Sequence, residues 1–310
     1  MGRGIVVVLG VLTLSAVVLG ACGFGFLLGA AADGTSVPFG GNAVAVIEVT
    51  GVIGGGESAD PFSGGAASGQ VIRWIEEAAN DGRVRAIVLR IDSPGGGVTA
   101  SDEIYNALVK AKGKGKKLVA SMGSTAASGG YYIAAPADRI VANPTSITGS
   151  IGVISVIPNV AGLMEKLGIE SYVFKSGPHK DSSYGLRPMT DADARIWQSI
   201  VDDSYERFVE IVASGRGMDA ATVRALADGR ILTGRQALAV KLVDELGDLP
   251  EAIQTAAKLG GISGEPQVIR YRNRGFLESL ASSWLRPPWQ GAADAFGLTV
   301  REPLQYRYLP

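Results

Sequence analysis

Between residues 43 and 175 the chain alternates short apolar runs with amphipathic segments, and this alternation constrains the fold more than any other feature. Strands that are apolar along nearly their whole length are typical of a parallel sheet buried on both faces. Strands that alternate with helices build such a sheet from βαβ units. The sequence therefore predicts an α/β fold with a mostly parallel sheet.

The boundaries of the expected elements follow from local patterns of apolar residues. Strands are expected at residues 43–49, 85–91, 118–122, 139–142, 151–157, 171–175 and 267–271. Helices are expected at residues 68–79, where Ser68 is a candidate cap, and at 99–112, 128–135, 159–167, 190–214, 219–227, 233–239 and 250–258. Residues 272–310 are rich in Trp and Pro and are interpreted as an irregular tail.

The N-terminal segment carries a strong topological signal. No residue from Ile5 to Ala32 is charged, and a helix of roughly 20 apolar residues is enough to span a membrane. Arg3 precedes the run and Asp33 follows it, which favours a cytoplasmic N-terminus. We expect a single-pass transmembrane anchor at residues 1–32, a linker at 33–42, and a catalytic region outside the cytoplasm at the cell membrane.

Two other interpretations of this segment stay open. A cleaved signal peptide has an apolar core of only about 7–15 residues, which is shorter than this run. The sequence Leu19-Gly20-Ala21-Cys22 resembles a lipoprotein processing box in which Cys22 would carry the lipid, although the chain stays apolar beyond it. All three interpretations place the remaining residues at the membrane or outside the cytoplasm.

Composition excludes several kinds of site. The 310 residues suffice for one large domain or two small ones, and 46% of them are apolar. A net charge of −1 offers no electrostatic basis for binding nucleic acid. Cys22 is the only cysteine, so neither an intrachain disulfide nor a cysteine metal site can form. His179 is the only histidine, so any Ser-His-Asp triad would have to use it.

The segment 121–132, with the sequence SMGSTAASGGYY, is a candidate nucleophile site. A strand is expected to end at Met122, and Ser128 would begin the next helix among small residues. A serine at a helix N-terminus benefits from free backbone N–H groups and from the helix dipole. Glycines such as Gly129 let a substrate backbone approach closely. The simpler interpretation is that Ser128 only caps the helix.

Two further segments hold groups that acyl-transfer chemistry needs. The turn SPGGG at 93–97 follows a buried strand, and its backbone N–H groups can stabilise an oxyanion, although it could equally be an ordinary strand-to-helix turn. The segment 174–181, FKSGPHKD, contains Lys175, His179 and Lys180. A lysine with the ordinary pKa of about 10.4 must be desolvated before it can act as a base, and an isolated loop lysine is usually just a solvated charge.

Taken together, these motifs resemble the signal peptide peptidase A family over residues 43–250. The motifs that occur in the order and spacing of that family are SPGGG, SMGSTAASGGYYIAAPADRI, TGSIGV, KSGPHKD, DDSYERFVEIVASGRGM and DGRILTGRQALAVKLVDELG. The length resembles the short bacterial form, which has one catalytic domain per chain.

The resemblance implies a role for each matching residue. Ser128 would be the nucleophile and Lys180, rather than the first lysine of its motif, the general base. Ser150 would hydrogen-bond the base amine. The backbone N–H groups of Gly96 and Gly129 would hold the oxyanion.

The resemblance also implies a fold and an activity. The fold would be ClpP-like and crotonase-like, with the protease domain at residues 43–262 and a C-terminal strand and tail at 263–310. The activity would be that of a serine endopeptidase that cleaves remnant signal peptides and other unfolded apolar segments. No metal or organic cofactor is implied. Relatives form octamer-like domes whose neighbouring subunits help to build one active site.

Two alternatives to this function remain, and one alternative to the mechanism. A crotonase-like acyl-CoA enzyme would share the fold and the backbone N–H groups that stabilise an oxyanion. The membrane anchor and the Ser128–Lys180 pair argue against it. A catalytically idle membrane scaffold would need neither residue. His179 precedes the expected base and is the residue on which a Ser-His mechanism would depend.

Overall fold

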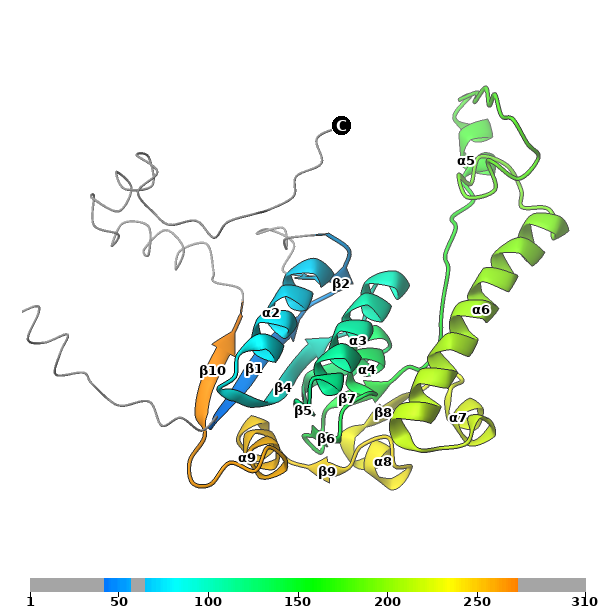
Figure 1. Ribbon diagram of the computed structural model, residues 1–310. Helices are drawn as coiled ribbons and strands as arrows, with labels where there is room; N and C mark the ends of the chain where they lie inside the picture. The colour runs from blue at the N-terminus through cyan, green and yellow to red at the C-terminus, as the bar shows by residue number, and fades with distance from the viewer. Residues whose placement is uncertain (1–41, 57–64, 273–310) are drawn as a thin grey trace, which may run out of the picture. The chain divides into compact units, whose positions relative to one another are not determined.

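The computed structural model describes residues 42–56 and 65–272 (Figure 1). The expected anchor at 1–32, nearly all of the linker and the tail at 273–310 lie outside the described residues. Among the residues that are described, no helix combines the length and the apolar character that crossing a bilayer requires.

A mostly parallel sheet forms the centre of the fold, as the sequence predicts. Its main strands, in spatial order, are β10 (Gln267–Tyr271), β1 (Ala43–Thr50), β4 (Val84–Ser93), β5 (Lys117–Ala127), β6 (Arg139–Ala142) and β9 (Glu245–Leu246). The strand β7 (Ile147–Gly149) pairs with the end of β5, and β8 (Ile231–Thr233) pairs antiparallel with β7. A separate pair joins β2 (Ile53–Gly54) to β3 (Ala66–Ala67).

Helices cover both faces of this sheet (Figure 1). Residues 68–166 contain α2 (Ser68–Asn80), α3 (Val98–Gly113), α4 (Gly129–Ala134) and α5 (Ala161–Lys166). Residues 191–259 contain α6 (Asp191–Arg216), α7 (Ala220–Leu226), α8 (Gly234–Ala239) and α9 (Leu249–Leu259). Every helix expected from the sequence is present, with its ends shifted by a few residues.

The strand β1 shows why the sheet is buried on both sides. Ala45, Ile47 and Val49 point to the face that α2 and α3 cover, because side chains alternate along a strand. Val44 and Val46 point to the opposite face and pack with α9. A strand with apolar residues on both faces is stable only between two layers of helices, so the continuous apolar run in the sequence already determines this arrangement.

Two of the expected strands are absent. Residues 151–157 and 171–175 form no strand, and β7 pairs with β5 in their place. Ile154 and Val156 are 83% and 74% exposed, and Phe174 is 96% exposed. These residues have the composition of strands, but no strand of the described ranges pairs with them, so composition alone mispredicts them. Ser68 also does not cap its helix: Ala67 is the N-cap, and the Ser68 hydroxyl donates to Glu103.

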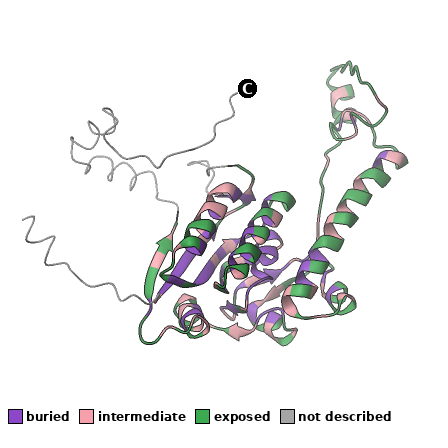
Figure 2. Cartoon of the chain, viewed as in Figure 1, coloured by how far each residue is buried: buried purple, intermediate pink, exposed green. Residues whose placement is uncertain are grey.

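Residues 153–200, here called the arm, differ from the rest of the fold in their burial (Figure 2). Only Asp181, Gly185 and Asp193 are buried in the arm. The helix α6 begins in the arm with a capping box between Thr190 and Asp193, and its second half buries side chains such as Phe208. One helix therefore connects the exposed arm to the hydrophobic core.

We predict that α6 is held to the core by a close backbone contact at Gly215. A Cβ atom there would lie 2.1 Å from the Ala135 carbonyl oxygen. Gly215→Ala should therefore lower the free energy of unfolding by about 1–3 kcal/mol, despite the higher helix propensity of alanine. Equilibrium denaturation measures this change. The control is Gly162→Ala in α5, where no atom lies within 4 Å of the added Cβ. Equal stability of the two variants would contradict the prediction.

Candidate functional site

Ser128 lies at the junction of β5 and α4, where the chain turns sharply. It is the N-cap of α4, with φ 52° and ψ −120°. A non-glycine residue with positive φ is uncommon and costs conformational energy, and such residues cluster at functional sites. The Ser128 amide donates to the Gly149 carbonyl, and the Ser128 carbonyl accepts from the Tyr132 amide. The surrounding backbone thus holds the Ser128 main chain in this conformation.

The glycine turn at 93–97 packs against the start of α4. A Cβ on Gly95 would lie 2.6 Å from the Gly129 nitrogen, and one on Gly129 would lie 3.1 Å from the Gly96 nitrogen. Only glycines permit this approach. In the described part of the chain, neither the Gly96 amide nor the Gly129 amide donates a hydrogen bond to the protein. Two backbone donors beside Ser128 are therefore available to a ligand.

Ser150 lies close to Ser128 through β7. The Gly149 carbonyl, which accepts the Ser128 amide, belongs to the residue directly before Ser150. The Ser150 amide donates to the Arg230 carbonyl at 2.8 Å, and Ser150 also has a positive φ, of 49°. Side-chain hydrogen bonds from Ser146 and Thr148 to β5 carbonyls fix this strand. Ser128 and Ser150 therefore occupy neighbouring strained turns.

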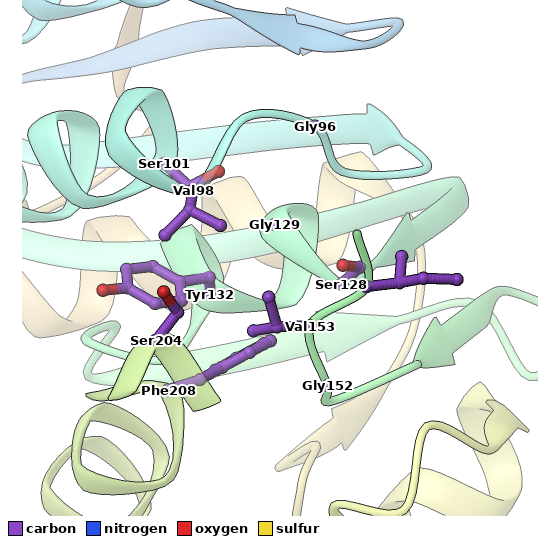
Figure 3. Close-up of a pocket in the computed structure, with 11 residues that line it drawn as sticks. Gly96, Val98, Ser101, Ser128, Gly129, Tyr132, Gly152, Val153, Ser204 and Phe208 are labelled. Carbon is purple, nitrogen blue, oxygen red and sulfur yellow. The ribbon is translucent and has the colours of Figure 1, made fainter. Parts of the chain in front are cut away.

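A cavity of about 90 Å³ opens beside Ser128 (Figure 3). Its walls come from the turn after β4, from α3 and α4, from the segment after β7 and from α6. Side chains that line it include Val98, Tyr132, Val153, Ile154 and Phe208. Figure 3 shows Val98, Tyr132 and Phe208 gathered around one space, with Ser128 to the side. The cavity is thus mainly apolar at its walls and carries hydroxyl and amide groups at one end.

Lys180 does not line this cavity. It lies exposed in the arm, and no hydrogen bond or ion pair involves its ammonium group within the described residues. The other two candidate bases have partners. Lys175 Nζ lies 2.8 Å from both carboxylate oxygens of Asp181, and His179 Nδ1 lies 2.6 Å from Asp193 Oδ1. Of these three residues, only Lys180 has an uncommitted side chain.

Arg187 connects the two buried carboxylates of the arm. Its guanidinium bonds Asp181 through Nε and Nη2, and Asp193 through Nη1 at 2.7 Å. Thr190 adds a hydroxyl and a backbone donor to Asp193. These charge-assisted hydrogen bonds tie residues 175–193 to the first turn of α6. The segment that carries Lys180 is therefore held at both sides.

The same bonds shift the titration of both carboxyls. Arg187 first and Lys175 second hold the pKa of Asp181 well below its usual range, and Arg187 with His179 and Thr190 lowers the pKa of Asp193. A depressed pKa means that the bonds stabilise the fold above the ordinary carboxyl value of about 4 and lose this effect as the pH falls below it. The arm should therefore stay ordered at neutral pH.

The sequence did not reveal all of these residues. Asp193 falls in the first turn of the helix expected at residues 190–214, where acids are favoured by the helix dipole alone. No local pattern linked Asp193 to His179, or Tyr132 and Phe208 to a cavity wall, since these pairs meet only in the folded chain. In turn, the structure brings Ser128, Ser150, Gly96 and Gly129 together, and it leaves Lys180 apart from them.

Comparison with known proteins decides the family. Residues 110–263 match Peptidase family S49, and this range includes Ser128, Ser150 and Lys180. The chain is also 44% identical, over 71% of its length, to the protein named "Putative protease slr0021" of Synechocystis, and it covers 75% of that protein. The chain belongs to peptidase family S49. It is a serine protease, which excludes the acyl-CoA alternative.

Two further proteins and a second family model are also similar to this chain. The chain is 39% identical over 70% of its length to "Putative signal peptide peptidase SppA" of Enterococcus faecium, and covers 63% of it. It is 39% identical over 71% of its length to "Protease 4" of Salmonella typhi, and covers 35% of that longer protein. Residues 68–148 also match Clp protease, which agrees with the expected ClpP-like fold.

We predict that Arg187 orders the segment that carries Lys180. Arg187→Gln removes a cation from two buried carboxylates, so amide hydrogen exchange in residues 176–190 should rise by about tenfold. Mass spectrometry of the exchanged protein at neutral pH measures the change, with peptides from β5 as an internal reference. Arg195→Gln, at an exposed arginine in the first half of α6, is the matched control. Unchanged exchange in Arg187→Gln would show that the network does not order the arm.

Proposed function

We propose that this S49 protease is a membrane-anchored signal peptide peptidase that works by a Ser-Lys mechanism. The observation that carries this proposal is the group around Ser128: a strained serine, two unbonded backbone amides and an adjoining apolar cavity. Such a group matches what attack on a peptide carbonyl requires. The remaining requirement is a base.

The chemical steps use these groups in order. Ser128 Oγ forms a bond to the carbonyl carbon of the substrate while its proton passes to the neutral amine of Lys180. The amides of Gly96 and Gly129 donate to the oxygen that becomes negative. The C–N bond then breaks, and the proton moves from Lys180 to the leaving amine. Water then attacks the acyl carbon while Lys180 takes its proton, the C–O bond to Ser128 Oγ breaks, and Lys180 returns the proton to Ser128 Oγ.

Lys180 is proposed to act on Ser128 of a neighbouring subunit. Its neighbour His179 bonds Asp193 in the first turn of α6, whereas the cavity beside Ser128 meets the same helix at Ser204. Eleven residues of helix separate Asp193 from Ser204, which is about 16 Å along the axis. A lysine side chain is too short for that distance. A base from a second copy of the chain provides the missing group.

The apolar surface of the arm supports such an assembly. Residues of the arm with exposed apolar side chains are Ile154, Val156, Val160, Leu163, Leu167, Ile169, Tyr172, Val173, Phe174, Tyr184, Met189, Ile196 and Ile200. Isolated exposed apolar residues are normal, but a concentration in one segment marks an interaction site. Burial against another subunit would also explain why 151–157 and 171–175 have the composition of strands. We propose a closed homo-oligomer of the octamer-like kind.

The cavity suggests the class of substrate. Its volume of about 90 Å³ is smaller than the ~150 Å³ cavity that holds benzene, so it suits an aliphatic side chain better than an aromatic one. Signal peptides consist largely of aliphatic residues. The uncharged run at residues 5–32 would hold the enzyme at the membrane where signal peptides are left after cleavage. Unfolded apolar peptides near the outer face are therefore the proposed substrates.

We predict that mixed oligomers recover activity that neither parent has. Ser128→Ala and Lys180→Ala should each reduce kcat/KM on an aliphatic peptide by at least about a thousandfold, because nucleophile and base act as a unit. Lys175→Ala should retain most activity. When the Ser128→Ala and Lys180→Ala chains are dissociated and reassembled together, some sites combine an intact serine with an intact lysine, and partial activity should return.

The reassembled mixture also provides the critical comparison. Oligomers reassembled from each variant alone control for the treatment itself. If the mixture stays as inactive as its parents while wild-type chains recover after the same treatment, Ser128 and Lys180 act within one chain. An inactive Lys175→Ala beside an active Lys180→Ala would instead move the base to Lys175.

We predict that Val98 controls which side chain fits beside Ser128. Val98→Phe narrows the cavity, so kcat/KM should fall by about tenfold for peptides with leucine at the cleavage site and much less for peptides with alanine. The matched control is Val109→Phe, an exposed position of the same helix that does not line the cavity. A parallel loss for both peptides would mean that Val98 affects stability and not selectivity.

A further inference from the structure

The sheet has a second functional edge, opposite to the one that carries Ser128. Because β1, β4 and β5 are parallel, they all begin at the same edge, here called the amino edge. The pairing of Ala43 with Val84, and of Ala86 with Lys117, places the first residues of these strands side by side. The catalytic group lies where the same strands end.

A cavity of about 480 Å³ opens at the amino edge between the starts of β4 and β5 and the end of α9. Its charged lining residues are Arg85, Lys114, Lys116 and Lys117, and no carboxylate lines it. The cavity is therefore a concentrated positive site in a chain whose net charge is only −1.

Within the described chain no ion pair joins any of these four cations to a carboxylate, although Asp81 attracts Lys116 electrostatically. Lys116 Nζ donates to the backbone carbonyls of Asp81 and Val84, and Lys114 Nζ donates to the amide oxygen of Asn80. The nearby carboxylates belong to other pairs, Asp81 with Arg83 and Asp138 with Lys112. An anion that enters the cavity would therefore meet four cations that are not held in ion pairs.

Helix dipoles do not account for all of this charge. Lysines in the last turn of a helix stabilise its C-terminus, and Lys110 and Lys112 of α3 have this role. Arg85 and Lys117 belong to strands, so no helix end requires them. Their presence in the same cavity indicates a ligand with several negative charges, or a surface that presents many.

The course of the chain identifies that surface. Asn42, the last residue before β1, lies at the amino edge because β1 begins at Ala43. Residues 33–42 join this point to the apolar run at 5–32 and span at most about 36 Å when extended. If the run crosses a membrane, as proposed above, the amino edge lies within reach of the lipid headgroups. Ser128, at the other edge, remains free for substrate.

We propose that the amino edge is a docking surface for the anionic headgroups of membrane phospholipids, with Arg85, Lys114, Lys116 and Lys117 as their ligands. The edge orients the catalytic domain on the bilayer, so that the site around Ser128 faces away from the membrane plane. This inference depends on the proposed membrane anchor, because a chain without one would not be held at the lipid surface.

The test uses the full-length protein in neutral detergent micelles. Phosphatidylglycerol is added in increasing mole fraction, and the midpoint of thermal unfolding is recorded, because a ligand of the folded state raises that midpoint. Each lysine near an anionic lipid surface contributes about fivefold to binding. Lys114→Gln/Lys117→Gln should therefore need about 25 times more phosphatidylglycerol for the same shift. Arg224→Gln/Arg235→Gln on α7 and α8 removes the same charge elsewhere and should behave as wild type.

Control additions to the same micelles distinguish an anionic lipid headgroup from a free anion. Phosphatidylcholine should give no shift, and high salt should abolish the response to phosphatidylglycerol. The proposal is overturned if Lys114→Gln/Lys117→Gln responds like wild type, or if phosphatidylcholine is as effective. It is also overturned if inorganic phosphate alone gives the full shift, since the site would then bind a free anion.

The same samples keep this test separate from the proposed function. Peptidase activity of Lys114→Gln/Lys117→Gln in neutral micelles should equal that of wild type, because neither residue lies near Ser128. A full-length protein that fails to partition into the detergent phase would contradict the anchor, whereas the response to phosphatidylglycerol would still report on the amino edge.

Discussion

The close contact between the glycine turn at 93–97 and the start of α4 is the constraint on which the site depends. A Cβ on Gly95 would lie 2.6 Å from the Gly129 nitrogen, so two backbone segments meet where any other residue would push them apart. This contact brings the Gly96 and Gly129 amides to the same place and leaves Ser128 in a conformation that non-glycine residues avoid. The sheet makes it possible, because the carboxyl ends of neighbouring parallel strands share one edge.

The two ends of α6 belong to two parts of the molecule that have different roles. Its second half buries side chains such as Phe208 beside the cavity, whereas its first turn lies in the arm, where Asp193 binds His179 and Arg187. The core alone holds Ser128, two unbonded backbone amides and a cavity, the groups that we propose as nucleophile, oxyanion donors and side-chain pocket. The arm holds Lys180 and an apolar surface that is exposed among the described residues. An assembly in which the arm of one copy reaches the core of the next would use both.

Sequence patterns predicted the sheet core and the helices well, because burial on both faces dictates continuous apolar runs such as the one in β4. They failed at residues 151–157 and 171–175, where the same composition occurs but the described part of the chain offers no strand partner. The family resemblance identified Ser128, Ser150, Gly96 and Gly129, which the structure brings together. It could not show that Lys180 lies apart from them. That distance depends on the length of α6 and on the pairing of Arg187 with two distant acids, which no local pattern encodes.

The central claim is that Lys180 approaches Ser128 only between subunits, and chemical cross-linking tests it most directly. Cys22→Ser removes the only native cysteine, after which Ser128→Cys and Lys180→Cys are introduced on separate chains and co-assembled. A short bis-maleimide reagent should then join the two chains into a species of twice the 32.0 kDa chain mass on a denaturing gel. With both cysteines in one chain, the account predicts a ladder of higher multiples. A cross-link formed only within single chains would contradict it.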